Sequence, residues 1–141
     1  HELALRLAQG FELAGILAIE LFVTKDERVI VNELAPRPHN SGHYTIEACS
    51  FDQFDAHIRG IAGWPLEQPE LLKPAVMVNV LGQHVAPTRA LIAEHPEWNM
   101  HDYCKAEVRH DRKMGHITVL TDDTRQTVAD LEWTGCWDDL K

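Results

Sequence analysis

The sequence has few cysteines, no long apolar run and no excess of positive charge. Its three cysteines, Cys49, Cys104 and Cys136, are odd in number and lack CxxC spacing, so they indicate reduced cytoplasmic thiols rather than disulfides or a zinc site. No apolar run approaches the roughly 20 residues of a membrane-spanning helix, and no signal peptide is visible. The formal net charge of −9 argues against a nucleic-acid polymer or an anionic membrane as the main partner.

The chain does contain enough apolar material for a core. Of its 141 residues, 45% are hydrophobic and 25% are charged, which suits one domain or two small lobes. The first residue is His1 rather than Met, and the residues after it already have a helical apolar spacing. We therefore expect the chain to be part of a longer protein.

Apolar periodicity and turn residues predict a mixed α and β architecture with a seam near residues 64–74. The elements expected before the seam are a helix over 2–13, a hairpin of strands 15–23 and 28–35, a loop over 36–43, and a helix that Ser50 caps and Gly63 ends. The elements expected after it are strands at 75–82, 105–109 and 116–120, and helices at 87–96 and 124–133, the last capped by Asp123 or Thr124.

Glu20 and Glu33 interrupt two strands whose faces are otherwise apolar, so we expect the hairpin to be central and largely covered. If the hairpin turns at Asp26–Glu27, the two glutamates lie directly opposite each other on one face. Like charges in that arrangement destabilise a sheet, and a hard divalent cation such as Mg²⁺ would resolve the conflict. Two alternatives stay open: a Lys or Arg pairs with each glutamate, or a register slip separates them.

The loop after the second strand concentrates polar groups in the segment VNELAPRPHNSGH. Arg37 carries a planar guanidinium suited to a carboxylate or phosphate, and it lies just past the strand that holds Glu33. His39 and Asn40 can orient a small anion or shuttle a proton. Each of these residues alone is more often a solvated loop residue, and it is their grouping after an acidic pair that favours an anion site.

A second polar group lies in the segment YCKAEVRHDRKMGH. Four cations fall there within nine positions of an acidic chain: Lys105, Arg109, Arg112 and Lys113. If residues 105–109 form a strand, Lys105 and Arg109 share a face, and Arg112 returns through the turn. Such a cluster can hold a phosphate monoester, and a solvated basic hairpin tip is the alternative.

These two motifs resemble a known family. NELAPRPHNSGH, followed by the Gln-Phe of SFDQFDAHIRGIAGWPL, is similar to the signature of N5-carboxyaminoimidazole ribonucleotide synthases, which are ATP-grasp ligases of purine biosynthesis. YCKAEVRHDRKMGHIT resembles the YGK…R…RKMGHIT element of the same family. The motifs stand in the family's order and separation, and the resemblance covers nearly the whole chain.

The resemblance implies an α+β fold in two parts. Residues 1–70 would be the C-terminal part of an ATP-grasp domain, an antiparallel sheet with flanking helices that carries the metal and anion site. Residues 71–141 would be a small β-rich C-terminal subdomain that contributes to the ribonucleotide phosphate site. The family's N-terminal part, with the lid over ATP and the adenine contacts, would precede His1. This chain alone would then be an inactive fragment of a cytoplasmic enzyme, which we expect to be a homodimer.

The resemblance also implies a reaction and its residues. ATP and bicarbonate give carboxyphosphate, which carboxylates the 5-amino group of aminoimidazole ribonucleotide to N5-carboxyaminoimidazole ribonucleotide. Three groups of residues match the family's sites: Mg²⁺ ligands Glu20 and Glu33, catalytic residues Arg37, His39 and Asn40 around bicarbonate or carboxyphosphate, and ribonucleotide phosphate residues Lys105 and Arg112.

The sequence departs from the family pattern in two places. Cys104 stands where the family usually has Gly, which would restrict the backbone there. Other ATP-grasp enzymes often have Asn two residues after the second Glu, where this chain has Ala35, and here Asn32 precedes the Glu instead. Two other readings are another ATP-grasp carboxylase or ligase, and a non-catalytic binding or dimerisation module that keeps the fold without the chemistry.

Overall fold

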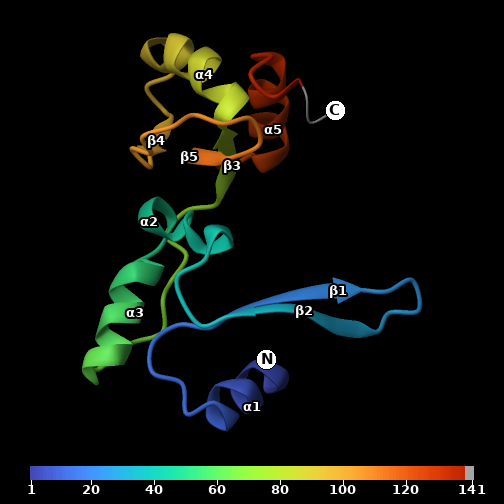
Figure 1. The fold of residues 1–141 in the computed structure, drawn as a ribbon, viewed down its shortest axis with the longest axis vertical. Helices are drawn as coiled ribbons and strands as arrows, with labels where there is room; N and C mark the ends of the chain where they lie inside the picture. Colours follow the sequence, from blue (N-terminus) through green and yellow to red (C-terminus); the bar gives the residue numbers. More distant parts are fainter. Residues whose placement is uncertain (139–141) are drawn as a thin grey trace. The chain divides into compact units, whose positions relative to one another are not determined.

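The computed structural model describes residues 1–138, which divide into two compact units (Figure 1). Unit 1 comprises His1–Ile46 and Ser50–Glu70, and unit 2 comprises Glu47–Cys49 and the residues from Leu71 onward. Every strand pair in this range is antiparallel, and helices accompany both sheets, so the α+β prediction is confirmed. Each helix in this range falls short of the length and apolar character that crossing a bilayer requires.

Unit 1 combines one hairpin with helices on either side of it in the sequence. Its elements are α1 (Glu2–Gly10), β1 (Ala18–Val23), β2 (Val29–Ala35), a 3₁₀ turn (Asn40–Gly42), the start of α2 (Thr45–Ala48) and α3 (Gln53–Ala62). The helix, hairpin and helix predicted before the seam are thus confirmed, although α1 ends at Gly10 and not at residue 13 as expected. The loop predicted over 36–43 contains the 3₁₀ turn.

The β1–β2 hairpin is less covered than its sequence suggested. It forms a two-stranded sheet of its own, and its distal half is exposed among the described residues. The exposed fractions there reach 58% for Phe22 and 73% for Val23. The prediction of a central, largely covered hairpin is therefore wrong for residues 1–138, because the apolar side chains of its distal half remain exposed.

Helix α3 is held at both ends by specific residues. Its N-cap is Asp52 rather than Ser50, since Asp52 Oδ1 accepts hydrogen bonds from Phe54 N at 2.7 Å and Asp55 N at 2.9 Å. Gly63 ends the helix in the left-handed conformation at φ 67°, as predicted. Along the helix, His57 Nδ1 accepts from Ile16 N at 3.1 Å and so ties α3 to the entry of β1.

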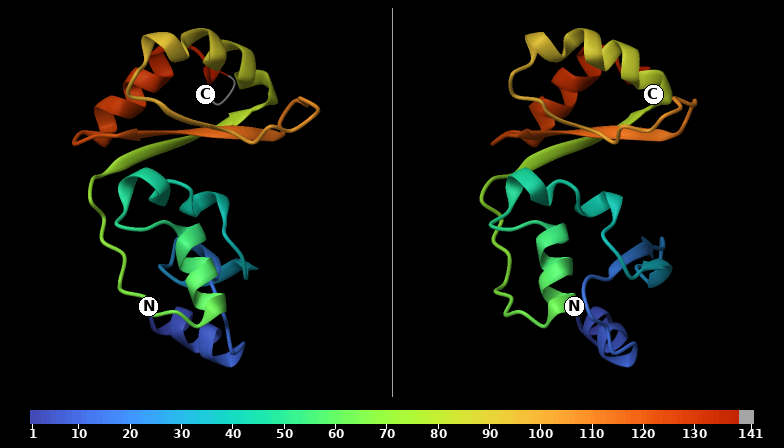
Figure 2. Two further views of the ribbon diagram at one scale, coloured as in Figure 1. Left: turned by 90° about the vertical axis from the view of Figure 1, so that its left-hand side faces the viewer. Right: turned by 60° about the vertical axis from the view of Figure 1, so that its left-hand side comes forward.

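Unit 2 is a three-stranded sheet with helices on one face. The strands, in the order β3-β5-β4, are β3 (Ala75–Leu81), β5 (Lys113–Leu120) and β4 (Asn99–Asp102). Helices α4 (Val85–Leu91) and α5 (Thr124–Trp133) lie on the same side of this sheet (Figure 2). The strands at 75–82 and 116–120 and both helices were predicted, and Asp123 caps α5 by accepting from Gln126 N at 3.0 Å.

The expected strand over 105–109 is wrong, and β4 was not predicted. Residues 105–109 form an irregular loop between β4 and β5. The central strand β5 already has β3 on one edge and β4 on the other, so no edge of it remains for a third partner. The polar sequence of Asn99–Asp102 concealed β4, because Asn and Asp are rare in strands.

The strand β5 is buried on both faces. Its Ile117 is fully buried in the cluster that also contains residues of β3 and α5, and its neighbours His116 and Thr118 are equally buried. His116 lies against the imidazole of His101 with ring centroids 4.5 Å apart, and His101 Nε2 in turn meets Glu47 Oε1 at 2.5 Å. The segment Glu47–Cys49 therefore belongs to unit 2, although unit 1 residues flank it in the sequence.

Candidate metal and anion site

The β1–β2 hairpin brings the two predicted carboxylates opposite each other. Glu20 pairs directly with Glu33, which confirms the predicted register at this position. The turn between the strands differs from the expected one. It spans the five residues 24–28 and is not a two-residue turn at Asp26–Glu27. The extra residue Asn32 forms a β-bulge that brings Glu33 back opposite Glu20. The register-slip alternative is therefore excluded.

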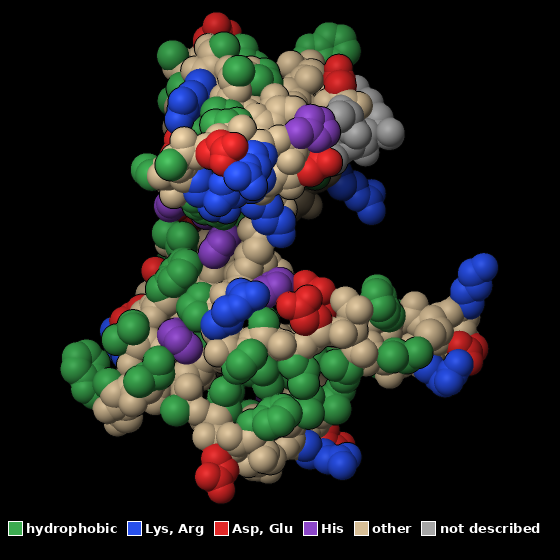
Figure 3. Space-filling view, in the orientation of Figure 1, with side chains coloured by type: hydrophobic (Ala, Val, Ile, Leu, Met, Phe, Trp, Pro, Cys, Tyr) green, Lys and Arg blue, Asp and Glu red, His purple; other side chains and the backbone are tan. Residues whose placement is uncertain are grey.

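Neither glutamate is neutralised by a Lys or Arg within residues 1–138. Glu20 Oε2 accepts a hydrogen bond from Asn32 Nδ2 at 3.1 Å, and Glu20 Oε1 lies 3.5 Å from His39 Nε2. Glu33 is exposed and makes no side-chain hydrogen bond or ion pair in this part of the chain. Figure 3 shows acidic, basic and histidine side chains gathered over the end of β1 and β2 furthest from the hairpin tip.

The carboxylate oxygens of Glu20 and Glu33 suit a hard cation whose other coordination positions are filled by a bound ligand and water. Among residues 1–138 no group of three or more His, Cys, Asp or Glu side chains is arranged to hold a metal by itself. Mg²⁺ does not need such a cage, because it usually takes one or two protein carboxylates together with waters and phosphate oxygens. The facing carboxylates of Glu20 and Glu33 are donors of that kind.

The loop Arg37–His43, called the anion loop below, follows β2 directly. His39 is only 14% exposed and is the member of this loop that lies beside Glu20. Its Nδ1 is 2.9 Å from Ser41 Oγ. Arg37 donates from Nη1 to the carbonyl of Pro38 at 3.1 Å, and no ion pair joins it to either glutamate in the described residues. Asn40 begins the 3₁₀ turn, and its carbonyl accepts from His43 N at 3.1 Å.

Sequence reasoning assigned no role to Gln53, which the structure places against this loop. Gln53 is the first residue of α3 and is 7% exposed. Its side-chain amide hydrogen-bonds the main chain of His39 at both N and O, each at 2.9 Å. The Gln-Phe pair in the second half of the first motif was the available signal, because a polar residue inside an apolar helix pattern needs a partner.

The two predicted phosphate residues lie in one loop of unit 2. Lys105 Nζ donates to the carbonyl of Lys113 at 2.6 Å and sits 5.4 Å above the ring of Tyr103. Arg112 Nη1 donates to the carbonyl of Glu107 at 3.1 Å. Lys105 also lines a cavity of about 230 Å³ that Arg89, Asp102 and Val108 share. Arg112 does not line that cavity. The two cations therefore lie in the same loop, but they donate to different carbonyl groups and do not contact one common group.

The residue before Lys105 has an unusual backbone. Cys104 adopts φ 51°, in the left-handed region that favours glycine. Its N–H donates to Asp102 Oδ1 at 2.8 Å, which closes a local turn at the end of β4. This backbone hydrogen bond, followed by one from Arg89, lowers the pKa of the Asp102 carboxyl below its ordinary value. The departure from the family's Gly therefore coincides with a position where Gly would be favoured.

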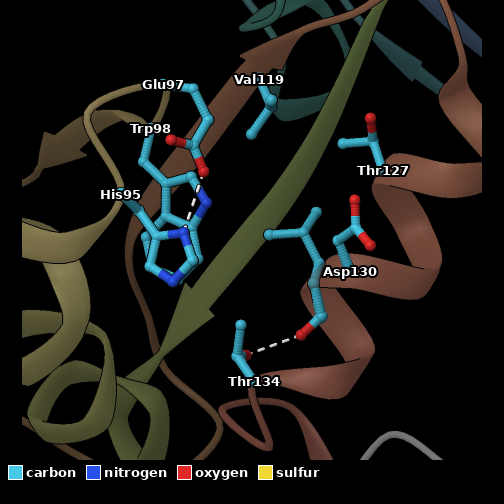
Figure 4. A pocket seen from close by; sticks show the side chains of 8 residues that line it. His95, Glu97, Trp98, Val119, Thr127, Asp130 and Thr134 are labelled. Carbon is cyan, nitrogen blue, oxygen red and sulfur yellow. Dashed lines mark hydrogen bonds and ion pairs between the residues drawn. The ribbon is translucent and has the colours of Figure 1, made fainter.

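Unit 2 also has a cavity of about 100 Å³ that none of the predicted site residues lines (Figure 4). His95 stacks on Trp98 with centroids 4.1 Å apart, and its Nδ1 is 2.9 Å from Glu97 Oε1. Thr127 and Asp130 approach the cavity from α5. Its size suits a few waters, and the chemistry predicted from the sequence lies elsewhere.

Two family models match the chain. The ATP-grasp domain matches residues 1–54, and the phosphoribosylaminoimidazole carboxylase C-terminal domain matches residues 75–130. The N5-carboxyaminoimidazole ribonucleotide synthases of Staphylococcus aureus (strain COL) and Staphylococcus epidermidis are 48% and 49% identical over 127 and 123 residues. These alignments cover 89% and 86% of this chain but only 34% and 33% of the relatives, so the chain spans about a third of their length.

Solved structures agree with these relatives. The N5-carboxyaminoimidazole synthetase of Staphylococcus aureus in complex with ADP has a TM-score of 0.89 at 46% identity, over 94% of this chain and 36% of that one. The Aspergillus clavatus enzyme in complex with ADP and 5-aminoimidazole ribonucleotide has a TM-score of 0.78 at 32% identity, over 95% of this chain and 39% of that one. Sequence, domain order and fold thus agree, and the chain belongs to the family of N5-carboxyaminoimidazole ribonucleotide synthases.

Proposed function

We propose that a full-length synthase carrying this sequence carboxylates 5-aminoimidazole ribonucleotide with ATP and bicarbonate, in purine biosynthesis. The γ-phosphoryl group of ATP passes to bicarbonate, giving ADP and carboxyphosphate. The 5-amino nitrogen of the ribonucleotide then attacks the carbon of carboxyphosphate, phosphate leaves, and the nitrogen loses a proton. The observation that carries the proposal is the facing pair Glu20 and Glu33 beside His39, in a chain homologous to these enzymes.

Glu20 and Glu33 are the residues that would hold Mg²⁺. A bound cation would neutralise charge on the transferring phosphoryl group, where positioning and electrostatics supply most of the catalysis. Asn32 and His39 orient the Glu20 carboxylate through their contacts with its two oxygens. Glu33 keeps both of its oxygens for the cation and its ligands, because no described side chain competes for them.

The anion loop would hold bicarbonate and then carboxyphosphate. Arg37 has five N–H donors in a planar fork, and its side chain donates to a single acceptor, the Pro38 carbonyl. The guanidinium can therefore bind a carboxylate or phosphate through two parallel hydrogen bonds. His39 and Asn40 follow it on the same loop, and His39 lies beside Glu20. With bicarbonate bound by this loop, the acceptor of the phosphoryl group would lie near the proposed metal.

We assign residues 1–70 the metal and anion site, and residues 71–141 a share in binding the ribonucleotide. Lys105 and Arg112 would contact its 5′-phosphate, because a phosphate dianion gains charge-assisted hydrogen bonds from both cations. Each of them donates to a main-chain carbonyl of its own loop, Lys113 and Glu107 respectively, and these contacts hold the cations in place. The binding energy would come from a part of the substrate remote from the chemistry, and it would position the amine.

The test is turnover by the full-length enzyme. We expect ADP release to require both aminoimidazole ribonucleotide and bicarbonate, and the carboxylated ribonucleotide to form in equal amount. The 141-residue chain by itself should not release ADP, because it spans about a third of its relatives' length. A full-length protein that binds ATP but shows no substrate-dependent turnover would contradict the proposal and support a non-catalytic module.

We also propose a cellular compartment and an oligomeric state for this enzyme. Cys49, Cys104 and Cys136 are free thiols, which suits the reducing cytoplasm where we place it. That the full-length enzyme is a homodimer stays a prediction, which sedimentation equilibrium can check.

A further inference from the structure

The side-chain amide of Gln53 makes three polar contacts with the anion loop. Its Oε1 accepts from His39 N at 2.9 Å, and its Nε2 lies 2.9 Å from the His39 carbonyl and 2.8 Å from His43 Nδ1. Its own main-chain N donates to Thr45 Oγ1 at 3.0 Å, and Thr45 Oγ1 donates to the carbonyl of Gly42 at 2.6 Å. One residue at the start of α3 thus holds the anion loop at His39 and at its C-terminal end.

These contacts determine the orientation of the amide and the tautomer of His43. A main-chain carbonyl can only accept, so the amide atom facing the His39 carbonyl is the NH₂ group. The same NH₂ group faces His43 Nδ1, which must therefore accept. A neutral imidazole that accepts at Nδ1 carries its proton at Nε2. His43 is stacked on Phe54 with centroids 5.6 Å apart, which fixes the plane of the ring.

Gly42 shows how tightly the amide is enclosed. A Cβ atom at this position would lie 2.5 Å from Gln53 Oε1 and 2.9 Å from its Cδ. Any side chain at position 42 would therefore displace the amide. Because Gly42 lies on the loop and Gln53 on the helix, the same contact can be broken from two independent elements.

We propose that Gln53 is a positioning residue for the anion site: it fixes the backbone at His39 and holds His43 at the end of the anion loop as the Nε2–H tautomer. This inference rests on the proposed function and deepens it. Gln53 acts through His39 and His43, and it needs no contact with the substrate itself.

The main test replaces Gln53 by Glu in the full-length enzyme. The carboxylate keeps the shape and the acceptor for His39 N, but it places an acceptor where the His39 carbonyl and His43 Nδ1 require a donor. We expect the KM for bicarbonate to rise about tenfold, as losing a buried hydrogen bond would cause. The KM for ATP should stay within about twofold, because the carboxylate pair is untouched. Loosely held carboxyphosphate should also make ADP release exceed carboxylated product.

The second readout is the ¹⁵N spectrum of the His43 imidazole, in enzyme labelled at histidine and assigned with a His43→Gln variant. In the parent enzyme Nδ1 should have the shift of an unprotonated nitrogen. In Gln53→Glu it should have that of a protonated one, because the new carboxylate accepts from it. This signal tests the contact between Gln53 and His43 directly, and the split between the KM for bicarbonate and the KM for ATP tests the positioning role.

Controls separate the possible outcomes. Asp55→Asn, which removes only an exposed ion pair with Arg59 on the same helix, should leave every parameter near the parent value. Gly42→Ala should raise the bicarbonate KM as Gln53→Glu does, and it provides the test if Gln53→Glu fails to fold.

A bicarbonate KM within twofold of the parent in either folded variant, or an unchanged His43 signal in Gln53→Glu, would overturn the inference. If the parent enzyme shows no bicarbonate dependence, the proposed function fails. The His43 spectrum then still tests whether Gln53 donates a hydrogen bond to His43 Nδ1.

Discussion

Unit 1 and unit 2 are stabilised by different kinds of contact. Unit 2 has a contiguous apolar core in which Val80 of β3, Ile117 of β5 and Leu131 of α5 are almost fully buried, together with Trp98 and Trp137. In unit 1 the buried residues among those described are Ala35 and the polar Gln53. Unit 1 is therefore organised by hydrogen bonds around the anion loop, and unit 2 by burial of apolar area.

This difference indicates which property, activity or stability, a substitution in each unit should change most. A two-stranded hairpin alone is marginally stable in water, and the β1–β2 hairpin exposes a run of apolar side chains: Leu21, Phe22, Val23, Val29, Ile30 and Val31. Apolar surface of this extent marks an interaction site. We therefore expect unit 1 to carry the proposed phosphoryl-transfer chemistry and to gain stability from contacts beyond the described residues, and unit 2 to fold around its own core.

The largest effect should come from a charge change in unit 1 that leaves stability alone. In the full-length enzyme, Glu33→Gln keeps the shape of the side chain but removes a carboxylate that would hold Mg²⁺. We expect kcat to fall by roughly 10²–10⁴-fold, as the loss of several kcal/mol of electrostatic stabilisation implies. The temperature of thermal unfolding should not fall, because Glu33 is exposed and unpaired and the change removes a like charge opposite Glu20. Glu27→Gln at the hairpin turn is the matched control, and near-normal turnover in Glu33→Gln would rule out Glu33 as an essential ligand.

The next effect concerns stability and should fall on unit 2. In the 141-residue chain, Ile117→Ala removes a fully buried side chain from the core and should lower the free energy of unfolding by about 2–5 kcal/mol. Ile30→Ala in the hairpin, where the side chain is 45% exposed, should cost less than about 1 kcal/mol. Urea unfolding followed by the fluorescence of the buried Trp98 and Trp137 measures the first, and circular dichroism the second. Equal costs would contradict the contrast between the units.

A third prediction asks whether unit 2 contributes to binding as well as to stability. Arg112→Glu in the full-length enzyme should raise the KM for aminoimidazole ribonucleotide by about tenfold or more, since it replaces a charge-assisted contact by repulsion. The KM for ATP should barely change. Arg125→Glu on α5 is a control of the same charge change in the same unit. If the ATP KM moves as much as the ribonucleotide KM, the assignment of this loop to the sugar phosphate is wrong.

How far the sequence predicted these features depends on how local their causes are. The pairing of Glu20 with Glu33 was predicted, but through a tight turn at Asp26–Glu27 that does not exist. The five-residue turn and the bulge at Asn32 compensate each other, so the pairing is as predicted while, toward the tip, Phe22 faces Ile30. The bulge also places the Asn32 amide on Glu20, where it orients the carboxylate. A bulge depends on both strands together, and alternation within one strand does not reveal it.

Long-range contacts account for what the sequence did not reveal. Residues 105–109 alternate polar and apolar side chains as a strand does, yet both edges of β5 are occupied by other strands. Gln53 looked like an ordinary residue at the start of a helix. Its role depends on the Arg37–His43 loop, which lies 14 positions away at His39. In contrast, single residues gave the end of α3 at Gly63 and the cap of α5 at Asp123, although the cap of α3 is Asp52 and not the expected Ser50.

The smallest predicted effect tests Cys104, a strained position beside the proposed phosphate site of unit 2. Cys104 holds φ 51°, which costs a residue with a Cβ about 1–2 kcal/mol. Gly is the residue expected at this position from the family resemblance. Cys104→Gly relieves that strain but raises the entropy of the unfolded chain, which offsets roughly 0.4–1 kcal/mol. The net result should be a stabilisation of a few tenths to about 1 kcal/mol, seen as a higher urea midpoint at an unchanged slope. Cys104→Ala keeps the Cβ and the strain, so it should stay near the parent midpoint. Equal midpoints for the Gly and Ala variants would show that the backbone at residue 104 stores no strain and that the family's Gly serves some other purpose, such as close approach of the substrate.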